Sequence, residues 1–331
     1  MMLPRRRFLS LAAGAAAAPV VSRIARAQAQ AYPSRPITMI VPYGGGGPAV
    51  GVARPLAERM AAALGQPIAI ENVGGESGTT GVTRAVRAAP DGYTLSFGHH
   101  GSHVVNGAVF PLPFDLRTDL EPIALLPSNP LLISARKDLP AASLKDLIAW
   151  MKDNPGKVKT ASAGAGSGTY VNAVYFQNAA GVSFEFVPHQ SVQTSIRALI
   201  AGELDVLFDQ ASNSLPHLRA GRIKAYAVTS SVRTQSAPEI PTTDEAGLAG
   251  FHSATWYGLW APKGTPREMI ATLNRTVVEA LADPALGKRY ADQGLDMPPR
   301  DRQTPEAFGT YHKAEIDKWW PIIKAAGIRG G

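Results

Sequence analysis

The sequence has 331 residues, 45% of them apolar, and no cysteine. This length suits about two domains with a substantial core, and the lack of cysteine excludes disulfides, thiolate nucleophiles and zinc–thiolate sites. The formal net charge is +7, but five arginines stand in the first 31 residues, which contain no acidic residue. The remaining chain has 28 basic and 26 acidic residues, a net charge of +2, which argues against nucleic acid as a partner.

Residues 1–31 resemble an export signal peptide. A charged start, PRRRFL, precedes the Ala-rich run FLSLAAGAAAAPVV, which is too short to span a bilayer, and ARAQAQA offers several A-x-A cleavage sites. Tandem arginines followed by Phe8 and Leu9 resemble the twin-arginine signal, with a Sec signal as the alternative. No cysteine follows to carry a lipid, and no later stretch is long and apolar enough for a transmembrane helix. We expect a bacterial periplasmic protein that is soluble after cleavage.

From residue 37 onward, strand-like runs alternate with helix-like segments. This alternation predicts an α/β fold with parallel sheets. Open sheets of this kind bind ligands at the carboxyl ends of their strands, in the turns that lead to helices. The predicted strands span residues 37–43, 68–72, 93–98, 131–136, 158–164, 184–189, 204–209, 223–229 and 256–262.

Two helix starts carry capping signals. Ser143, followed three residues later by Asp146, predicts the N-cap of a helix that extends to residue 154. Thr265 is predicted to cap a second helix, with Pro266 in the first helical position and Glu268 closing the capping box.

Four glycine-rich turns follow predicted strands, at residues 42–48, 72–81, 98–103 and 162–169. Because glycine has no side chain, backbone N–H groups can converge on a ligand, and a following helix adds partial positive charge. Any one of these segments could be only a tight turn. Four of them at strand ends favour a site for a small anion such as a carboxylate.

Competing motifs are incomplete. A dinucleotide fingerprint would need a third glycine after Gly164 and Gly166, where Thr169 stands, and no G-x-S-x-G elbow is present. We therefore expect no cofactor.

The histidines of residues 98–103 have no carboxylate near them in the sequence, so we expect no metal site and treat them as solvent-facing or ligand-facing. A runner-up from another functional class is an exported serine hydrolase that uses Ser102 or Ser167 with a loop histidine and Asp209. No nucleophile motif supports it.

The chain from residue 32 to 328 resembles the periplasmic substrate-binding receptors of tripartite tricarboxylate transporters, often called the Bug family. The resemblance rests on segments in a fixed order, among them YPSRPITMIVPY, PDGYTLSFG, ASAGAGSGT, WYGLWAPKGTP and IKAAGI. It implies a two-lobed, type II-like Venus flytrap α/β fold with a ligand cleft between the lobes and no enzymatic activity. Members deliver organic anions to an inner-membrane permease, or serve as sensors that would present the solute to a histidine kinase ectodomain.

Several positions depart from the family pattern. They are Gly44 and Gly45 in place of prolines, Val50 in place of an Asp, Val73 in place of an Arg, Glu76 in place of a small residue, and residues 189–191 in place of a Tyr-Lys-Gly-like turn. The segment SAGAGSGT and Asp209 are retained. The resemblance therefore implies an inherited carboxylate cradle in the second lobe and an altered specificity surface in the first.

We expect a monomer with lobe 1 at residues 32–130 and 254–331 and lobe 2 at residues 131–253. The predicted ligand-binding residues come from the glycine turns and two further strand ends. They are Tyr43, Gly44, Gly45, Gly46, Gly47, Glu76, His99, His100, Ser102, Ser162, Gly164, Gly166, Ser167, Thr169, His189 and Asp209.

Residues 162–169 are predicted to hold one carboxylate, and Tyr43 to face the other end of the ligand. Because Val50 replaces the usual Asp, no group in the first loop matches an ammonium, which disfavours an amino-acid ligand.

His99, His100 or His189 could pair with a second carboxylate if protonated, given an unperturbed pKa near 6.5. Glu76 would repel a dianion if it pointed inward. We favour a monocarboxylate or small dicarboxylate with an apolar or aromatic body over tricarboxylates.

Overall fold

The computed structural model describes residues 32–45, 48–162 and 168–329, apart from the side chains of Gly168 and Thr169. Its strands have the order β2-β1-β3-β9-β4-β7-β5-β6, and β8 pairs with β4 off this path. At one end, three parallel strands are joined by an antiparallel one that pairs with β3. These strands are β1 (Ile37–Val41), β2 (Ile68–Asn72), β3 (Thr94–His99) and the antiparallel β9 (Ala254–Pro262).

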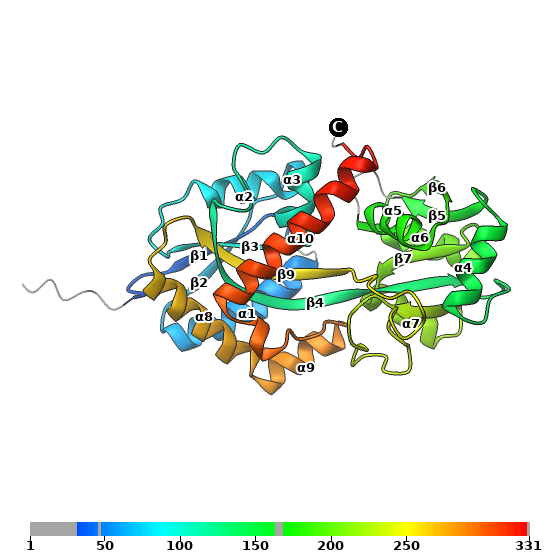
Figure 1. Cartoon of the computed structure of the whole chain (residues 1–331). Coiled ribbons are helices and arrows are strands. Elements are labelled where there is room, and N and C mark those ends of the chain that lie inside the picture. The colour runs from blue at the N-terminus through cyan, green and yellow to red at the C-terminus, as the bar shows by residue number, and fades with distance from the viewer. Residues whose placement is uncertain (1–31, 46–47, 163–167, 330–331) are drawn as a thin grey trace, which may run out of the picture.

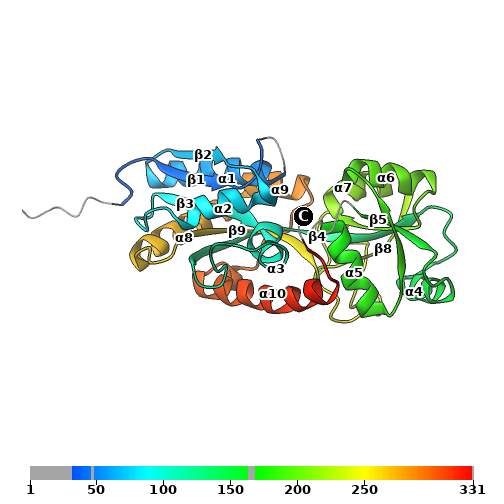
Figure 2. The same ribbon diagram turned by 90° about the horizontal axis from the view of Figure 1, so that it is seen from above.

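The long strand β4 (Leu120–Arg136) belongs to both ends of the sheet. Its residues 120–130 pair with β9, and its residues 131–136 pair with β7 and β8. We call β1, β2, β3, β9 and residues 120–130 the first strand group. Figures 1 and 2 show it as one body, joined through β4 to a second.

The second strand group contains β5–β8 and residues 131–136 of β4. Its parallel members have the order β7-β5-β6. The bounds are Val158–Ser162 for β5, Phe184–Pro188 for β6, Val206–Gln210 for β7 and Ile223–Val228 for β8.

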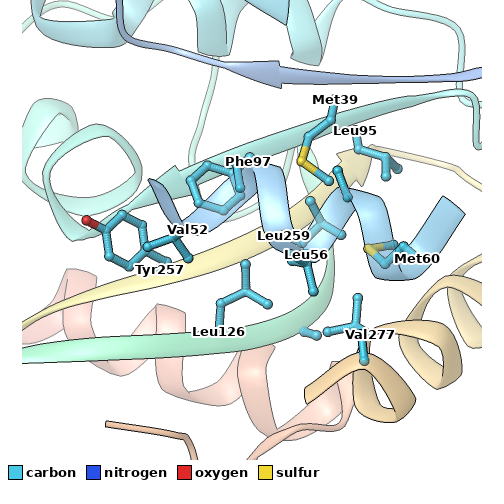
Figure 3. Packing of buried hydrophobic residues seen from close by; sticks show 14 of the residues in the cluster. Met39, Val52, Leu56, Met60, Leu95, Phe97, Leu126, Tyr257, Leu259 and Val277 are labelled. Atoms are coloured by element: carbon cyan, nitrogen blue, oxygen red, sulfur yellow. The ribbon is translucent and has the colours of Figure 1, made fainter. Parts of the chain in front are cut away.

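One face of the first strand group packs against three helices. These are α1 (Pro48–Leu64), α8 (Arg267–Leu281) and α9 (Pro284–Asp292). Met39, Phe97 and Leu259 from the sheet meet Leu56 and Val277 from the helices in this core (Figure 3). Burial of such side chains contributes about 25 cal/mol of folding free energy per Å² of apolar surface removed from water. This core therefore holds the ends of the strands in place.

The opposite face carries α2 (Thr79–Val86), a π-helical turn at Gly101–Val105, α3 (Asn106–Val109) and the last helix, α10 (Pro305–Ala325). Strand β9 contributes side chains to the cores on both faces of the sheet, because successive side chains of a strand point to opposite faces. Its Tyr257 and Leu259 pack with α1, whereas Trp256 and Trp260 pack with α10. Short 3-10 turns complete this part of the chain at Glu76–Gly78 and Arg300–Arg302.

Four helices cover the second strand group. They are α4 (Leu144–Asp153), α5 (Gly168–Ala180), α6 (Val192–Ala201) and α7 (Ala211–Arg219). Phe208 of β7 contacts Phe176 of α5 and Phe184 of β6, at ring-centroid distances of 4.8 and 5.7 Å. In the part of the chain that the structure describes, no helix combines the length and apolar character needed to cross a bilayer.

Each run predicted as a strand coincides with one of the nine strands of the described residues. The predicted parallel pairing holds for β1, β2 and β3 and for β5, β6 and β7, whereas β4 and β9, which the prediction did not distinguish, run antiparallel to their neighbours. The first half of β4 was also missed. Its Pro122, Pro127 and Pro130 are unusual in strands because proline cannot donate to a ladder. The register with β9 shifts after Pro122 and between Leu125 and Ser128, the interval that contains Pro127, while Pro130 pairs with Ala254 at the end of the ladder.

The two predicted helix caps have different outcomes. Ser143 is the N-cap of α4, and its Oγ accepts a hydrogen bond from the N–H of Asp146 at 3.1 Å. The prediction for Thr265 was wrong, because its hydroxyl donates to the carbonyl of Pro262 at 2.7 Å. Helix α8 therefore begins one residue later than predicted, at Arg267. Its N-cap is Pro266, which makes no side-chain capping hydrogen bond.

Candidate functional site

A cavity of about 560 Å³ lies between the two strand groups. Its wall combines turns that follow β1 and β3, residues of α5 and β7, and two residues of β9. Among the described residues that line it, none is Asp, Glu, Lys or Arg. The lining residues are Tyr43, Gly44, Pro48, Ala49, Ser77, His99, His100, Gly101, Val105, Asn106, Val171, Asn172, Gln210, Thr255 and Tyr257.

An aromatic group forms part of this wall. The rings of Tyr43 and His99 stack with centroids 4.7 Å apart and an interplanar angle of 7°. Tyr257 meets His99 edge-on, at 5.8 Å and 86°. Burial raises the pKa of the Tyr43 hydroxyl, against the effect of its hydrogen bonds with Ser102. These rings therefore present uncharged polar tips on an apolar body.

His99 is held in one orientation and is neutral. Its Nδ1 accepts a hydrogen bond from the N–H of Gly101 at 2.8 Å, so the ring proton of the neutral form resides on Nε2. Burial, reinforced by the neighbouring His100, lowers the pKa of His99 to about 3. Protonated His99, the form that could pair with a second carboxylate, is therefore disfavoured at neutral pH, because desolvation disfavours the imidazolium form.

His100 is 8% exposed and is also neutral. Burial is the main cause that lowers its pKa to about 3, and the neighbouring Lys318 and His312 add to it. The protonated form that could pair with a second carboxylate is therefore disfavoured near pH 7 for this residue too. Its ring lies edge-on to Trp319 at 4.9 Å. Its Nε2 is 3.9 Å from Oε2 of Glu315, a carboxylate of α10 that the local sequence around the histidines could not reveal.

Comparison with known proteins identifies the family of this chain. A family model described as the tripartite tricarboxylate transporter family receptor matches residues 52–328. The chain belongs to this family. Protein BugT of Bordetella pertussis is 31% identical over 303 residues, which cover 91% of this chain and 92% of BugT.

Two solved structures extend the comparison. The chain is similar to MatC from Rhodopseudomonas palustris with bound malate, with 37% identity, a TM-score of 0.71 and coverage of 88% of this chain and 100% of MatC. It is also similar to Rpa4515 of the same species with adipate, with 31% identity, a TM-score of 0.73 and coverage of 90% and 99%. The periplasmic-binding-protein fold expected from the sequence is thereby confirmed.

In this Bug-family receptor, the turn after β2 presents Ser77 rather than Glu76 to the cavity. Glu76 lines a separate hollow of about 370 Å³, and its Oε2 accepts a hydrogen bond from Thr79 Oγ1 at 3.1 Å. The repulsion of a dianion that an inward Glu76 would cause therefore does not arise from this conformation. The carbonyl of Ser77 is held by the side-chain N–H of Asn106 at 2.9 Å.

Ser102 and Asp209 are not in the described wall of the cavity. Ser102 is 1% exposed, and its Oγ lies 2.9 Å from His103 Nδ1. Asp209 is 2% exposed, and its carboxylate accepts hydrogen bonds from Asn213 and Ser214, both at 3.2 Å. Burial raises the pKa of Asp209 to about 6. Ser102 thus lies beside a loop histidine, but Asp209 is hydrogen-bonded to Asn213 and Ser214 and is not the partner that orients this histidine in a hydrolase triad.

Val50, where the resemblance led us to expect an Asp, packs into the core between α1 and the sheet. It is 6% exposed and does not line the cavity, unlike Ala49 directly before it. The departure therefore changes the core of the first strand group and not the described wall.

The second-lobe turn is only partly described. Gly164, Gly166 and Ser167, like Gly46 and Gly47 of the first turn, lie outside the described residues, as does the side chain of Thr169. Gly44 lines the cavity, while Gly45, Ser162 and His189 are not among its described lining residues. The N–H of His189 donates to the carbonyl of Ser162 at 2.8 Å, which joins the ends of β5 and β6.

Sequence reasoning missed several residues of the wall, notably Asn106, Asn172, Gln210 and Tyr257. Gln210 directly follows the predicted Asp209, and strand alternation could have suggested it. A further hollow of about 670 Å³ shares Gln210 and Tyr257 with the cavity and extends toward α7 and α9. No group of three or more His, Asp or Glu side chains within the described ranges is placed to hold a metal ion.

Proposed function

We propose that this protein is a periplasmic receptor that captures a small organic carboxylate in the 560 Å³ cavity and delivers it to the inner-membrane permease of a tripartite tricarboxylate transporter. The observation that carries the proposal is a wall of uncharged polar groups contributed by both strand groups. Family membership and the malate and adipate bound by similar receptors support the same class of ligand.

Helix ends supply the attraction for an anion where charged side chains are missing from the described wall. Helix α1 begins at Pro48, which lines the cavity, and α7 begins directly after the lining residue Gln210. Helix α5 begins at Gly168 and contributes Val171 and Asn172. The first N–H groups of a helix are unpaired and carry partial positive charge, so they favour a carboxylate.

The ligand we propose is a monocarboxylate or small dicarboxylate with an apolar or aromatic body. Tyr43, His99 and Tyr257 offer an aromatic surface of limited polarity for that body. No acidic residue lines the described wall, so an ammonium group would be desolvated without a partner, at considerable cost. A micromolar dissociation constant needs about 8 kcal/mol, which a few charge-assisted hydrogen bonds of about 1.5–3 kcal/mol each can supply after ordering costs.

We further propose that the lobes divide at residues 130/131 and 253/254. The pairing partner of β4 changes from β9 to β7 and β8 at Pro130 and Leu131, and β9 begins at Ala254. Closure of two such lobes around a ligand would exclude water and strengthen each polar contact.

A thermal-shift screen followed by calorimetry tests this proposal. Mono-, di- and tricarboxylates, aromatic acids and amino acids are each added to the purified mature protein. We expect mono- or dicarboxylates to raise the melting temperature and to be recovered chemically unchanged. Stabilisation by tricarboxylates or amino acids alone would refute the ligand class, and turnover of a ligand would refute a purely receptor function.

A further inference from the structure

His100 is a rigid part of the cavity wall, fixed from several sides. It directly precedes the π-helical turn Gly101–Val105, and its ring is packed edge-on against Trp319 at 4.9 Å and Trp256 at 6.2 Å. Only 8% of the residue is exposed. A ring held in this way cannot rotate freely to suit different ligands, so its hydrogen-bonding groups keep a fixed direction.

The two ring nitrogens of His100 have different surroundings. Nε2 is buried and makes no hydrogen bond within the described part of the chain; its nearest charged atom is Glu315 Oε2 at 3.9 Å. Nδ1 likewise has no hydrogen-bond partner among the described residues, but it is not one of the buried unpaired atoms. Since His100 lines the cavity, Nδ1 is the nitrogen that a ligand can reach.

Glu315 decides which nitrogen carries the proton. Its Oε2 accepts the indole N–H groups of Trp256 at 3.1 Å and Trp319 at 3.3 Å, and these two bonds hold the carboxylate in place beside His100. A negative charge beside Nε2 favours the tautomer with its proton on Nε2. Nδ1 then presents a lone pair to the cavity, which can accept a hydrogen bond but cannot donate one.

We propose that His100 is a specificity-determining residue that accepts a hydrogen bond from a hydroxyl group on the bound carboxylate. The receptor would then prefer hydroxycarboxylates to the matching carboxylates without the hydroxyl. This inference rests on the proposed carboxylate-binding function. A ligand without the hydroxyl leaves Nδ1 desolvated and unpaired, and sites built to bind a hydroxyl discriminate against such analogues.

The test is calorimetry with matched ligand pairs: lactate and propionate, malate and succinate, mandelate and phenylacetate. We expect the wild-type protein to bind the hydroxylated member of at least one pair about tenfold more tightly. His100→Phe keeps an aromatic ring but removes the acceptor, and should bring that pair to within about twofold of each other. The matched control is His252→Phe, the same substitution at a histidine outside the cavity wall, whose 40% exposed side chain pairs with Asp244; it should retain the preference.

A second measurement avoids any loss of folding in the variants. The ¹⁵N chemical shifts of His100 in the wild-type protein report its tautomer, and we expect the proton on Nε2, with a change at Nδ1 on addition of the preferred hydroxycarboxylate only. Equal affinities within every pair, an unchanged preference in His100→Phe, or a proton on Nδ1 in the free protein would overturn the inference. If no carboxylate binds at all, the proposed function fails together with it.

Discussion

Asp209 and Gln210 are neighbours at the end of β7, yet their side chains have different surroundings. Successive side chains of a strand point to opposite faces, so Gln210 lines the cavity while Asp209 is buried with Asn213 and Ser214 of α7. The carboxylate of Asp209 therefore contributes to the start of α7. It affects the described wall only indirectly, because it helps to fix the position of Gln210.

Asp209 should make stability depend on pH. Burial raises its pKa in the folded protein to about 6, above the unfolded value of about 3.9. The folded state therefore binds more protons between about pH 4 and 6, and the contribution of Asp209 to stability falls as the pH rises through that window. We expect Asp209→Asn to gain stability relative to wild type from pH 4 to pH 7, by about 3 kcal/mol at most. Urea unfolding at several pH values measures this, and parallel pH profiles for the two proteins would contradict it.

At the scale of an element, the turn Gly75–Gly78 combines unusual backbone angles with a position at the cavity. Glu76 and Ser77 have φ values of 46° and 56°. Residues other than glycine adopt this left-handed region only at a cost in conformational energy. Gly78, with φ of 97°, lies close to Tyr43: an added Cβ would stand 3.0 Å from the carbonyl of Pro42 and 3.3 Å from the Tyr43 ring. The turn therefore supports the aromatic wall from behind.

Gly78→Ala should reduce both stability and ligand affinity. Gly65→Ala is the matched control, because Gly65 also has positive φ (67°) but an added Cβ would meet no atom within 4 Å. We expect the control to lose about 1–2 kcal/mol from backbone strain alone and to bind ligand normally. Gly78→Ala should lose more and bind a carboxylate more weakly, because the Tyr43 ring must shift. Equal losses of stability and unchanged binding in both variants would exclude a supporting role for this turn.

At the scale of the whole molecule, the features set by local sequence patterns could be predicted, whereas those set by contacts between distant segments could not. Strand alternation and glycine turns placed Tyr43, His99 and His100 near strand ends, where the structure puts them in one wall. The antiparallel return of β9 and the docking of α10 depend on packing between segments more than 100 residues apart. For that reason neither Glu315 beside His100 nor the low pKa of the histidines could be read from the sequence.

The last helix links the two strand groups. Helix α10 packs on the first strand group, and its C-terminal half approaches α5 in both views (Figures 1 and 2). Lys318 Nζ donates to the carbonyl of His252 and lies 4.8 Å from the Tyr175 ring centroid. Trp319 meets the same ring edge-on at 5.0 Å. Since Tyr175 belongs to α5, these contacts fix the relative position of the two bodies beside the cavity.

Replacement of Lys318 should loosen this link. In Lys318→Met the hydrogen bond to His252 and the cation–π contact with Tyr175 are both lost, and we expect affinity for a bound carboxylate to fall about three- to tenfold. The ligand-free protein should also become more extended in small-angle X-ray scattering. Lys324→Met is the control on the same helix, because Lys324 contacts the ring of Trp320 within α10, at 5.5 Å. If the two variants give the same scattering profile and the same dissociation constant, Lys318 does not hold the bodies together, and cavity geometry is set by β4 and β9 alone.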